Sequence, residues 1–143
     1  MDGVLADFNK LRESMGLTGD EIKKLPGTFR LMDPVPGAID AVRSLIGMGH
    51  DVWVATKAPT GIAFAYADKV TWILSHLPEL KRKIVITHDK SLLIGDVLVD
   101  DRPDRANASH FSGRLIVFGG DVGWPEVLKL IRGETKQNNR EGT

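Results

Sequence analysis

The sequence predicts an α/β fold in which helices flank a parallel β-sheet. From about residue 34 onward, short apolar runs with strand character alternate with segments of helical periodicity. The strand-like runs are almost unbroken in apolar residues, which is typical of parallel strands covered on both faces. This alternation indicates a parallel sheet with helices packed against it, and 143 residues correspond to one domain.

The first part of the alternating region predicts two helices separated by a strand. Apolar side chains recur at helical spacing within residues 38–48, at Ile39, Val42, Leu45 and Ile46. Residues 52–55 form a β-rich run followed by a loop. Residues 65–77 predict a second helix, which Pro78 ends.

The second part predicts three further strands and a last helix. The strands cover residues 84–86, 96–99 and 115–118, and the helix covers residues 124–131. Beyond that helix, residues 132–143 are polar with mixed charge, so we expect a disordered tail.

Composition narrows the class of protein. Hydrophobic residues make up 42% and charged residues 27%, as in an ordinary globular protein. Nineteen basic and nineteen acidic residues give zero net charge, so we expect no nucleic-acid polymer and no membrane as partner. No apolar run is long enough to span a bilayer, and we expect no signal peptide.

Some side-chain chemistries are absent or do not form a pattern. The chain has no cysteine, which excludes disulfides, thiolate zinc sites and a cysteine nucleophile, and which fits a cytoplasmic location. The four histidines share no metal-ligand spacing. The tryptophans fit core or helix-docking positions better than base-stacking ones; they are Trp53, Trp72 and Trp124.

Polar residues follow the predicted strands at the positions where each strand ends. Thr56 follows the first strand, Lys90 follows the second, and Asp100 and Asp101 follow the third. In a parallel sheet, ligands bind at the carboxyl ends of the strands. Taken singly, these residues are more often caps, turn residues or solvated side chains. Their common placement is what makes them candidates for a site.

The adjacent carboxylates of Asp100 and Asp101 favour a metal site. Like charges at the end of a buried strand are costly unless a cation lies near them. Oxygen ligands suit Mg²⁺, which keeps several waters and needs few protein carboxylates. The alternative is that the pair serves caps and turns, with Arg102 neutralising one carboxylate. We favour the metal site modestly on this pair alone.

The candidates together suit phosphoryl transfer. Thr56 offers a hydroxyl, Lys90 an ammonium group and Asp100–Asp101 a cation site, while the opening loop adds Asp2 beside Gly3. A hydroxyl and an ammonium group hold phosphoryl oxygens, and a divalent cation neutralises the remaining charge. Phosphoryl transfer depends on that positioning and on those electrostatics.

At this point the chain resembles the haloacid dehalogenase (HAD) superfamily of phosphatases, and most closely its 5′(3′)-deoxyribonucleotidase branch. Four ordered stretches are similar to the family motifs: residues 1–8 to Asp-x-Asp-Gly-Val-Leu-Ala-Asp-Phe, Thr56 in Val-Ala-Thr-Lys-Ala-Pro, Lys90 in Ile-Thr-His-Asp-Lys-Ser, and Asp100-Asp101-Arg102-Pro103-Asp104. Residues 34–38 and Asp68-Lys69-x-x-Trp72 also resemble this branch. The likeness covers residues 1–131.

The resemblance implies a Rossmann-like HAD fold and a two-step hydrolysis of phosphomonoesters. One domain would cover residues 1–131, with a small helical cap at about residues 8–32. A carboxylate would attack the phosphorus and form an aspartyl-phosphate. Asp2 would protonate the leaving oxygen and later activate water, and its main-chain carbonyl would bind Mg²⁺. Asp101 would bind the metal directly and Asp100 through water.

The resemblance also assigns the substrate side of the site. Thr56 and Lys90 would hold the phosphoryl group, and Lys90 would offset the negative charge around the metal. Lys57 follows Thr56 and either contacts a substrate phosphate or is solvated; both interpretations stay open. The implied partner is a small phosphate ester, namely a nucleoside monophosphate. The sequence does not indicate the oligomeric state or the preferred base.

One departure from the family pattern concerns the nucleophile. The attacking Asp of the family precedes the position of Asp2 by two, which lies before residue 1. The apolar strand that leads into it, central in the family sheet, is absent too, so we expect a sheet without its first central strand. Either the sequence starts late, at an internal Met or by truncation, or it is a real short form. Residues 1–143 alone would be inactive by this mechanism.

The other departure is the cap, whose segment of about 25 residues is short for a nucleotidase. It has apolar positions for two short helices, with Thr18 or Asp20 as the N-cap of the second. Phe8, Phe29 and Arg30 are candidate substrate contacts, and we favour a core role for the two aromatics. The short cap keeps two alternatives open: a phosphatase for sugar phosphates or other small esters, and a non-catalytic phosphate- or nucleotide-binding protein.

Overall fold

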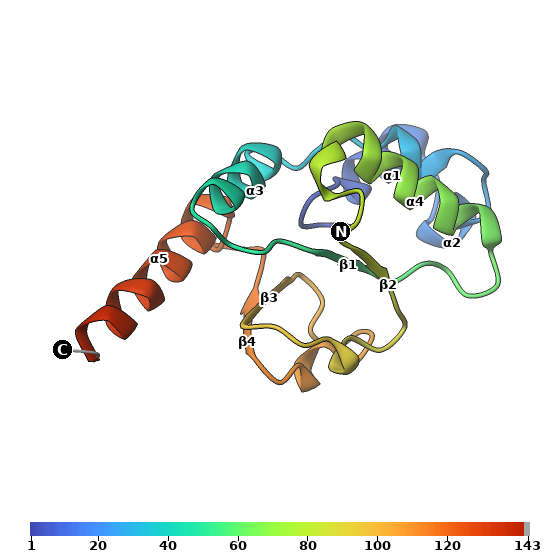
Figure 1. Cartoon of the computed structure of the whole chain (residues 1–143). Coiled ribbons are helices and arrows are strands. Elements are labelled where there is room, and N and C mark those ends of the chain that lie inside the picture. The colour runs from blue at the N-terminus through green and yellow to red at the C-terminus, as the bar shows by residue number, and fades with distance from the viewer. Residues whose placement is uncertain (142–143) are drawn as a thin grey trace.

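Four short strands form two parallel pairs in the part of the chain that the computed structural model describes, namely the backbone of residues 1–141 and the side chains of residues 1–133. In the first pair, β1 (Val54–Thr56) lies beside β2 (Ile84–Ile86). In the second pair, β3 (Val97–Asp100) lies beside β4 (Arg114–Val117). The predicted α/β class with parallel strands is confirmed (Figure 1).

The two strand pairs do not share a hydrogen-bonded ladder within the described backbone. β1 pairs with β2 alone and β3 pairs with β4 alone, so one edge of each strand is left without a partner strand. The sequence predicts such a gap, because the family resemblance places a central strand there. Unpaired edges leave backbone donors and acceptors open.

Three helices were predicted in the alternating region, and all three are present. α3 (Ala38–Gly47) and α4 (Ala63–His76) begin and end within two residues of the predicted bounds. α5 (Trp124–Glu141) differs, because it continues far beyond residue 131. Helix therefore occupies residues 132–141, where a disordered tail was expected, and residues 142–143 lie outside the described residues. None of the helices described has the length and apolar character to cross a bilayer.

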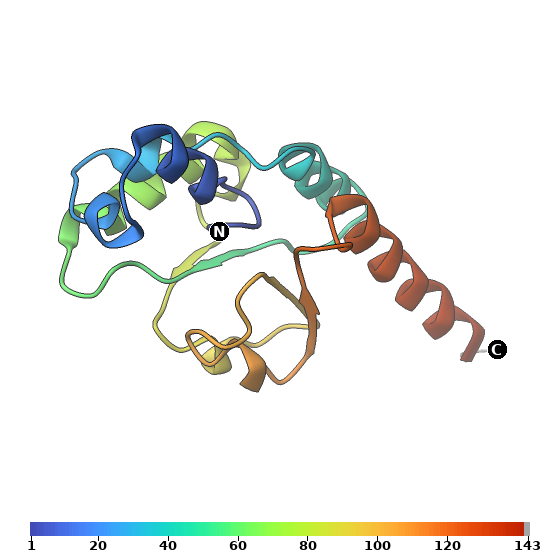
Figure 2. The same cartoon turned by 180° about the vertical axis from the view of Figure 1, so that it is seen from behind.

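The cap segment, residues 8–32, forms two short helices and a 3₁₀ turn: α1 (Phe8–Met15), α2 (Gly19–Lys23) and η1 (Thr28–Leu31). The two predicted helices are confirmed. Of the two candidate N-caps of α2, the side chain of Thr18 is the one that accepts a hydrogen bond, from Glu21 N at 3.2 Å. Figures 1 and 2 show α1 and α2 beside α4, on the side of the strands that faces away from β3 and β4.

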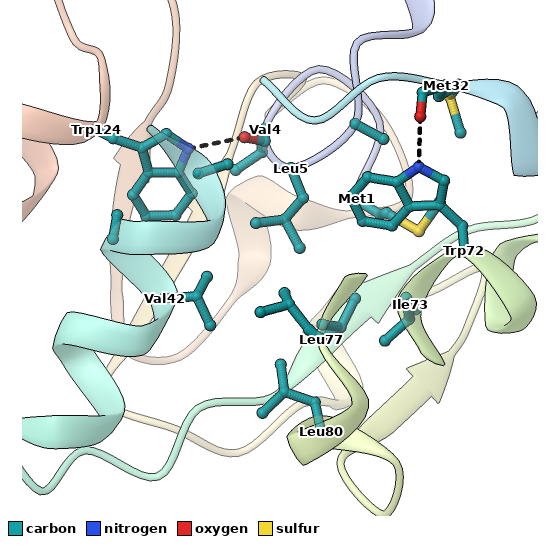
Figure 3. Packing of buried hydrophobic residues seen from close by; sticks show 14 of the residues in the cluster. Met1, Val4, Leu5, Met32, Val42, Trp72, Ile73, Leu77, Leu80 and Trp124 are labelled. Carbon is teal, nitrogen blue, oxygen red and sulfur yellow. Dashed lines mark hydrogen bonds between the residues drawn. The ribbon is translucent and has the colours of Figure 1, made fainter. Parts of the chain in front are cut away.

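The core joins the opening loop to the helices (Figure 3). Trp72 of α4 is buried, and its Nε1 donates to Met32 O at 2.7 Å. Trp124 at the start of α5 is buried as well, and its Nε1 donates to Val4 O at 2.9 Å. Because buried indole N–H groups require a partner, these two bonds fix where the cap segment and the opening loop lie. The predicted core role is wrong for Trp53, which is 50% exposed.

Candidate active site

All six residues that the sequence assigns to catalysis, to phosphate binding or to the metal line a single cleft of about 780 Å³. They are Asp2, Thr56, Lys57, Lys90, Asp100 and Asp101. These six come from the opening loop, the end of β1, the turn after β2 and the end of β3. Within each parallel pair the register aligns the strand ends, with Thr56 opposite Ile86 and Asp100 opposite Val117. The contact between Lys90 and Asp100 joins the two pairs. Side chains far apart in the sequence therefore face the same space.

Lys90 and Asp100 form a buried ion pair at the floor of the cleft. Lys90 Nζ donates to Asp100 Oδ2, and both residues are less than a tenth exposed. The other carboxylate oxygen, Asp100 Oδ1, accepts from Arg102 N at 2.7 Å. The main chain also fixes Lys90, whose N–H donates to Ala106 O at 2.7 Å. Buried charges need such partners, so the pair is held in one arrangement.

Asp101 lies directly against Gly3. A Cβ atom placed on Gly3 would be 2.0 Å from Asp101 Oδ2, and Gly3 has φ of +76°. Only glycine fits both the backbone conformation and the space. Burial raises the pKa of the Asp101 carboxyl above its usual range, and the neighbouring Asp100 carboxylate raises that pKa further. The Asp101 carboxylate is therefore costly in this position unless a cation accompanies it.

Lys69 of α4 is a buried residue of the cleft that sequence reasoning did not include in the site. Its ammonium group donates to Asp2 Oδ2 at 3.0 Å and to Thr56 Oγ1 at 3.3 Å. It also lies 4.8 Å from the centre of the Phe29 ring. Lys69, to which the sequence analysis gave no role in the site, thus links the predicted site residues Asp2 and Thr56.

A signal for Lys69 does exist in the sequence. Ala65, Trp72 and Ile73 lie four, three and four positions from Lys69, and all three are buried on one face of α4. A charged residue within an apolar helix stripe requires a buried partner. The sequence analysis noted Asp68-Lys69-x-x-Trp72 as similar to the family, but it assigned catalytic, phosphate-binding and metal roles only to residues of the opening loop and of the strand ends.

The carboxylates of the cleft provide oxygen groups of the kind that Mg²⁺ prefers. Asp2 Oδ1 is buried and has no hydrogen-bond partner, while Oδ2 of the same residue is held by Lys69. Within the described part of the chain, no three His, Cys, Asp or Glu side chains converge closely enough to hold a metal by themselves. A Mg²⁺ site that retains several waters needs fewer carboxylates than that. With Asp100 engaged by Lys90, Asp101 is the carboxylate best placed for direct contact.

The cap segment forms the opposite wall of the cleft. Phe8 and Arg12 come from α1, and Lys23 and Lys24 come from the end of α2. Phe8 stacks on Phe29 with ring centroids 6.0 Å apart. Both rings line the cleft. Phe29 is 1% exposed and belongs to the core, as favoured, whereas Phe8 is half-buried.

Two arginines that were weighed from the sequence have clear positions. Arg30 does not line the cleft and instead pairs with Asp68, with Arg30 Nε and Asp68 Oδ1 3.2 Å apart, so the structure does not support it as a substrate contact. Arg102 lines the cleft and pairs with Asp104, with Arg102 Nε and Asp104 Oδ1 3.3 Å apart. Lys57 lines the cleft and is exposed, so both interpretations, a substrate phosphate contact and a solvated side chain, stay open.

Known proteins resemble this chain along most of its length. A family model described as "5′ nucleotidase, deoxy (Pyrimidine), cytosolic type C protein" matches residues 21–124. A Bordetella bronchiseptica protein designated a candidate 5′(3′)-deoxyribonucleotidase is 36% identical over 147 residues, covering 82% of this chain and 79% of that protein. The human cytosolic 5′(3′)-deoxyribonucleotidase is 31% identical over 104 residues, covering 70% of this chain and 52% of the human protein.

A mouse relative extends the comparison. The mitochondrial 5′(3′)-deoxyribonucleotidase of Mus musculus is 29% identical over 118 residues, covering 80% of this chain and 54% of the mouse protein. The chain therefore spans about four fifths of the Bordetella bronchiseptica relative and about half of the two mammalian ones.

Proposed function

We propose that this chain, which belongs to the 5′ nucleotidase, deoxy (Pyrimidine), cytosolic type C protein family, acts as a Mg²⁺-dependent 5′(3′)-deoxyribonucleotidase that releases phosphate from nucleoside monophosphates. The observation that carries the proposal is the convergence of six nominated residues on one cleft. The cleft volume of about 780 Å³ lies within the usual range for small-molecule sites. The proposal includes a cytoplasmic location, supported by the absence of cysteine.

The strand ends supply the phosphoryl-binding groups. Thr56 offers a hydroxyl at the end of β1, and Lys90 offers an ammonium group held by Asp100. In the proposed complex the Lys90 ammonium group contacts both Asp100 and the phosphoryl oxygens. Asp100 thus positions the ammonium group and still leaves it able to bind phosphate. Lys57 lies at the mouth of the cleft and adds a second cation near the phosphate.

Asp2 has the geometry of a general acid and base. Its Oδ2 is anchored by Lys69 at 3.0 Å, whereas its Oδ1 has no hydrogen-bond partner. One oxygen thus sets the orientation of the carboxyl group, and the other is available to carry a proton. In the proposed reaction Oδ1 gives its proton to the leaving oxygen of the nucleoside and then takes one from the water that attacks the intermediate.

Asp101, the main-chain carbonyl of Asp2 and, through water, Asp100 are the groups that would hold Mg²⁺. Bound there, the ion supplies positive charge that offsets the phosphoryl oxygens and orients them. A cation would also relieve the cost of the Asp101 carboxylate, whose pKa is raised by burial and by the carboxylate of Asp100.

The attacking group of this mechanism belongs to the position two residues before Asp2, which lies outside residues 1–143. A carboxylate there would form the new bond to phosphorus while the bond to the nucleoside oxygen breaks and that oxygen is protonated. Water would then cleave the aspartyl-phosphate and regenerate the carboxylate.

The test separates binding from turnover. The 143-residue chain should bind thymidine 5′-monophosphate in the presence of Mg²⁺, as measured by calorimetry. A version extended upstream with the genomic codons should release inorganic phosphate, and Asp2→Asn should reduce that release by about 10²–10⁴-fold. An extended version that carries the upstream Asp and yet hydrolyses sugar phosphates in preference to every nucleoside monophosphate would contradict the nucleotidase assignment.

A further inference from the structure

The cleft is far more positive than the chain as a whole. Its lining includes eight basic residues, Arg12, Lys23, Lys24, Lys57, Lys69, Lys90, Arg102 and Arg105, and four acidic residues, Asp2, Asp20, Asp100 and Asp101. The difference is four positive charges, whereas the 143 residues together have a net charge of zero. A concentration of one sign of charge in a cleft indicates a ligand of the opposite sign.

Half of these cations already have acidic partners. Lys69 pairs with Asp2, Lys90 with Asp100, and the two arginines 102 and 105 with Asp104. No carboxylate among the described side chains forms an ion pair with the remaining four, which are Arg12, Lys23, Lys24 and Lys57. Three of these four come from the cap segment and face the strand ends across the cleft.

Arg12 gives the strongest indication that the cap segment side of the cleft binds an anionic group. Its Nε is buried and has no hydrogen-bond partner in the part of the chain that the structure describes. A buried donor without an acceptor is costly, and native structures rarely keep one without a reason. An anionic oxygen that enters the cleft beside α1 would satisfy it, and arginine is well suited to phosphate oxygens.

The two groups of cations belong to separate walls. Thr56, Lys57 and Lys90 are at the carboxyl ends of strands, while Arg12 and Lys23 are on α1 and α2 of the cap segment (Figures 1 and 2). A single phosphate held at the strand ends leaves the cations of the cap segment without an acceptor. A ligand with two anionic groups reaches both walls.

We propose that the substrate of this cleft carries two phosphate groups, as in a deoxynucleoside 3′,5′-bisphosphate. The strand ends hold the phosphate that is removed, and Arg12, Lys23 and Lys24 bind the one that stays. The inference rests on the proposed function and specifies its substrate class. The sign of the charge agrees with it, because each phosphate monoester carries about −2 at neutral pH and the side chains that line the cleft have a surplus of four positive charges before Mg²⁺ is counted.

Calorimetry on the 143-residue chain with Mg²⁺ tests this directly. The ligands are thymidine 5′-monophosphate and thymidine 3′,5′-bisphosphate, and the variants are Arg12→Gln and the double variant Lys23→Gln/Lys24→Gln. We expect the unaltered chain to bind the bisphosphate at least about tenfold more tightly than the monophosphate. Both variants should reduce that ratio toward about one while changing the Kd of the monophosphate less than about twofold.

Lys81→Gln is the matched control, because Lys81 is exposed, lies outside the cleft and forms no ion pair in the described residues. Its ratio of affinities should equal that of the unaltered chain. If Arg12→Gln does not fold, the double variant Lys23→Gln/Lys24→Gln tests the inference by itself. It removes two charges from the end of a short helix. Equal affinity of the unaltered chain for the two ligands overturns the inference, as does an equal loss of affinity for both in the variants.

A further arm distinguishes a second phosphate on the substrate from a separate anion. Saturating inorganic phosphate should compete with the bisphosphate; if it instead strengthens binding of the monophosphate, the second anion is independent and the inference is overturned.

A failure of the bisphosphate inference can be distinguished from a failure of the proposed function. When the monophosphate binds and the bisphosphate binds no better, only the substrate class is wrong. When neither ligand binds with Mg²⁺ present, the nucleotidase assignment fails as well.

Discussion

Lys69 Nζ lies 3.0 Å from Asp2 Oδ2, so a residue of helix α4 holds the carboxylate of the opening loop from a distance of 67 positions in the sequence. Lys69 is buried, and its ammonium group donates to this carboxylate, to the Thr56 hydroxyl and to the Lys57 carbonyl. The contact ties Asp2, the proposed general acid and base, to Thr56 at the strand end where we propose that phosphate binds. It makes Lys69 a positioning residue for the proposed reaction.

Replacing Lys69 with Met should lower the rate of phosphate release by the version extended upstream, because the Asp2 carboxyl loses the donor that sets its orientation. A phosphate-release assay at saturating substrate measures this. Lys69→Arg keeps a charged donor and should retain more of the rate than Lys69→Met. A rate that is identical in all three proteins would show that Lys69 only fills space.

Breaking the Lys90–Asp100 pair should destabilise the fold. Removal of one partner of a buried ion pair costs about 3–5 kcal/mol, because the other charge is left uncompensated. We expect Lys90→Met and Asp100→Asn each to lower the free energy of unfolding in urea on that scale. The double variant Lys90→Met/Asp100→Asn should lose less than the sum of the two single losses, so additive losses would indicate that the two residues act independently.

Mg²⁺ should stabilise the protein through Asp101, and the effect should depend on pH. The pKa of this carboxyl is raised in the folded state, so the folded chain holds the proton more strongly than the unfolded chain does. Without a cation, stability therefore falls as pH rises from the unfolded pKa through the folded one. Above that window the charged carboxylate is a cost, and Mg²⁺ should remove it.

Asp101→Asn tests this by thermal unfolding. At pH 7 without metal the variant should have a higher Tm than the unaltered chain, because the amide carries no charge to bury. Added Mg²⁺ should raise the Tm of the unaltered chain and leave that of the variant unchanged. The Mg²⁺ effect should also shrink as pH falls, since protons compete for the carboxylate. A variant that responds to Mg²⁺ like the unaltered chain would place the ion elsewhere.

Gly3→Ala should weaken both the fold and the response to Mg²⁺. The added Cβ would be 2.0 Å from Asp101 Oδ2, so the carboxylate must move. Gly16→Ala is the matched control: Gly16 has φ of +64° and no atom within 4 Å of the added Cβ. It isolates the backbone cost of a left-handed alanine, about 1–2 kcal/mol. Gly3→Ala should cost more than Gly16→Ala in urea unfolding, and it alone should reduce the Tm increase caused by Mg²⁺.

Much of the fold and site followed from the sequence because two signals coincide. Apolar runs locate the strands, and the polar residue after each run locates the strand end, so Thr56, Lys90 and Asp100 could be predicted to share one edge. Lys69 could not be found this way because its position depends on how α4 packs against the strands. The cations of the cap segment were not recognised either, since Arg12 and Lys23 read as solvated faces of short helices until the cleft brings them opposite the strand ends.

The structure differs from the sequence-based expectation at two further places, the segment after residue 131 and Trp53. The segment after residue 131 is polar, which suggested disorder, but straight-chain polar residues are also good helix formers, and α5 runs through to Glu141. Trp53 was expected at a core or helix-docking position. It precedes β1, which begins at Val54, and its indole donates to Asp51 Oδ1 at 3.1 Å near the surface.

The hydrogen bond from Trp124 to the Val4 carbonyl has a consequence for the order in which the protein is made. The two residues are 120 positions apart, so Val4 emerges from the ribosome well before its hydrogen-bond donor does. At ordinary rates of translation the wait is roughly 6–24 seconds. Until Trp124 emerges, the Val4 carbonyl lacks this donor, while the hydrogen bonds from Asp7 N to Asp33 O and from Val35 N to Leu5 O can already form.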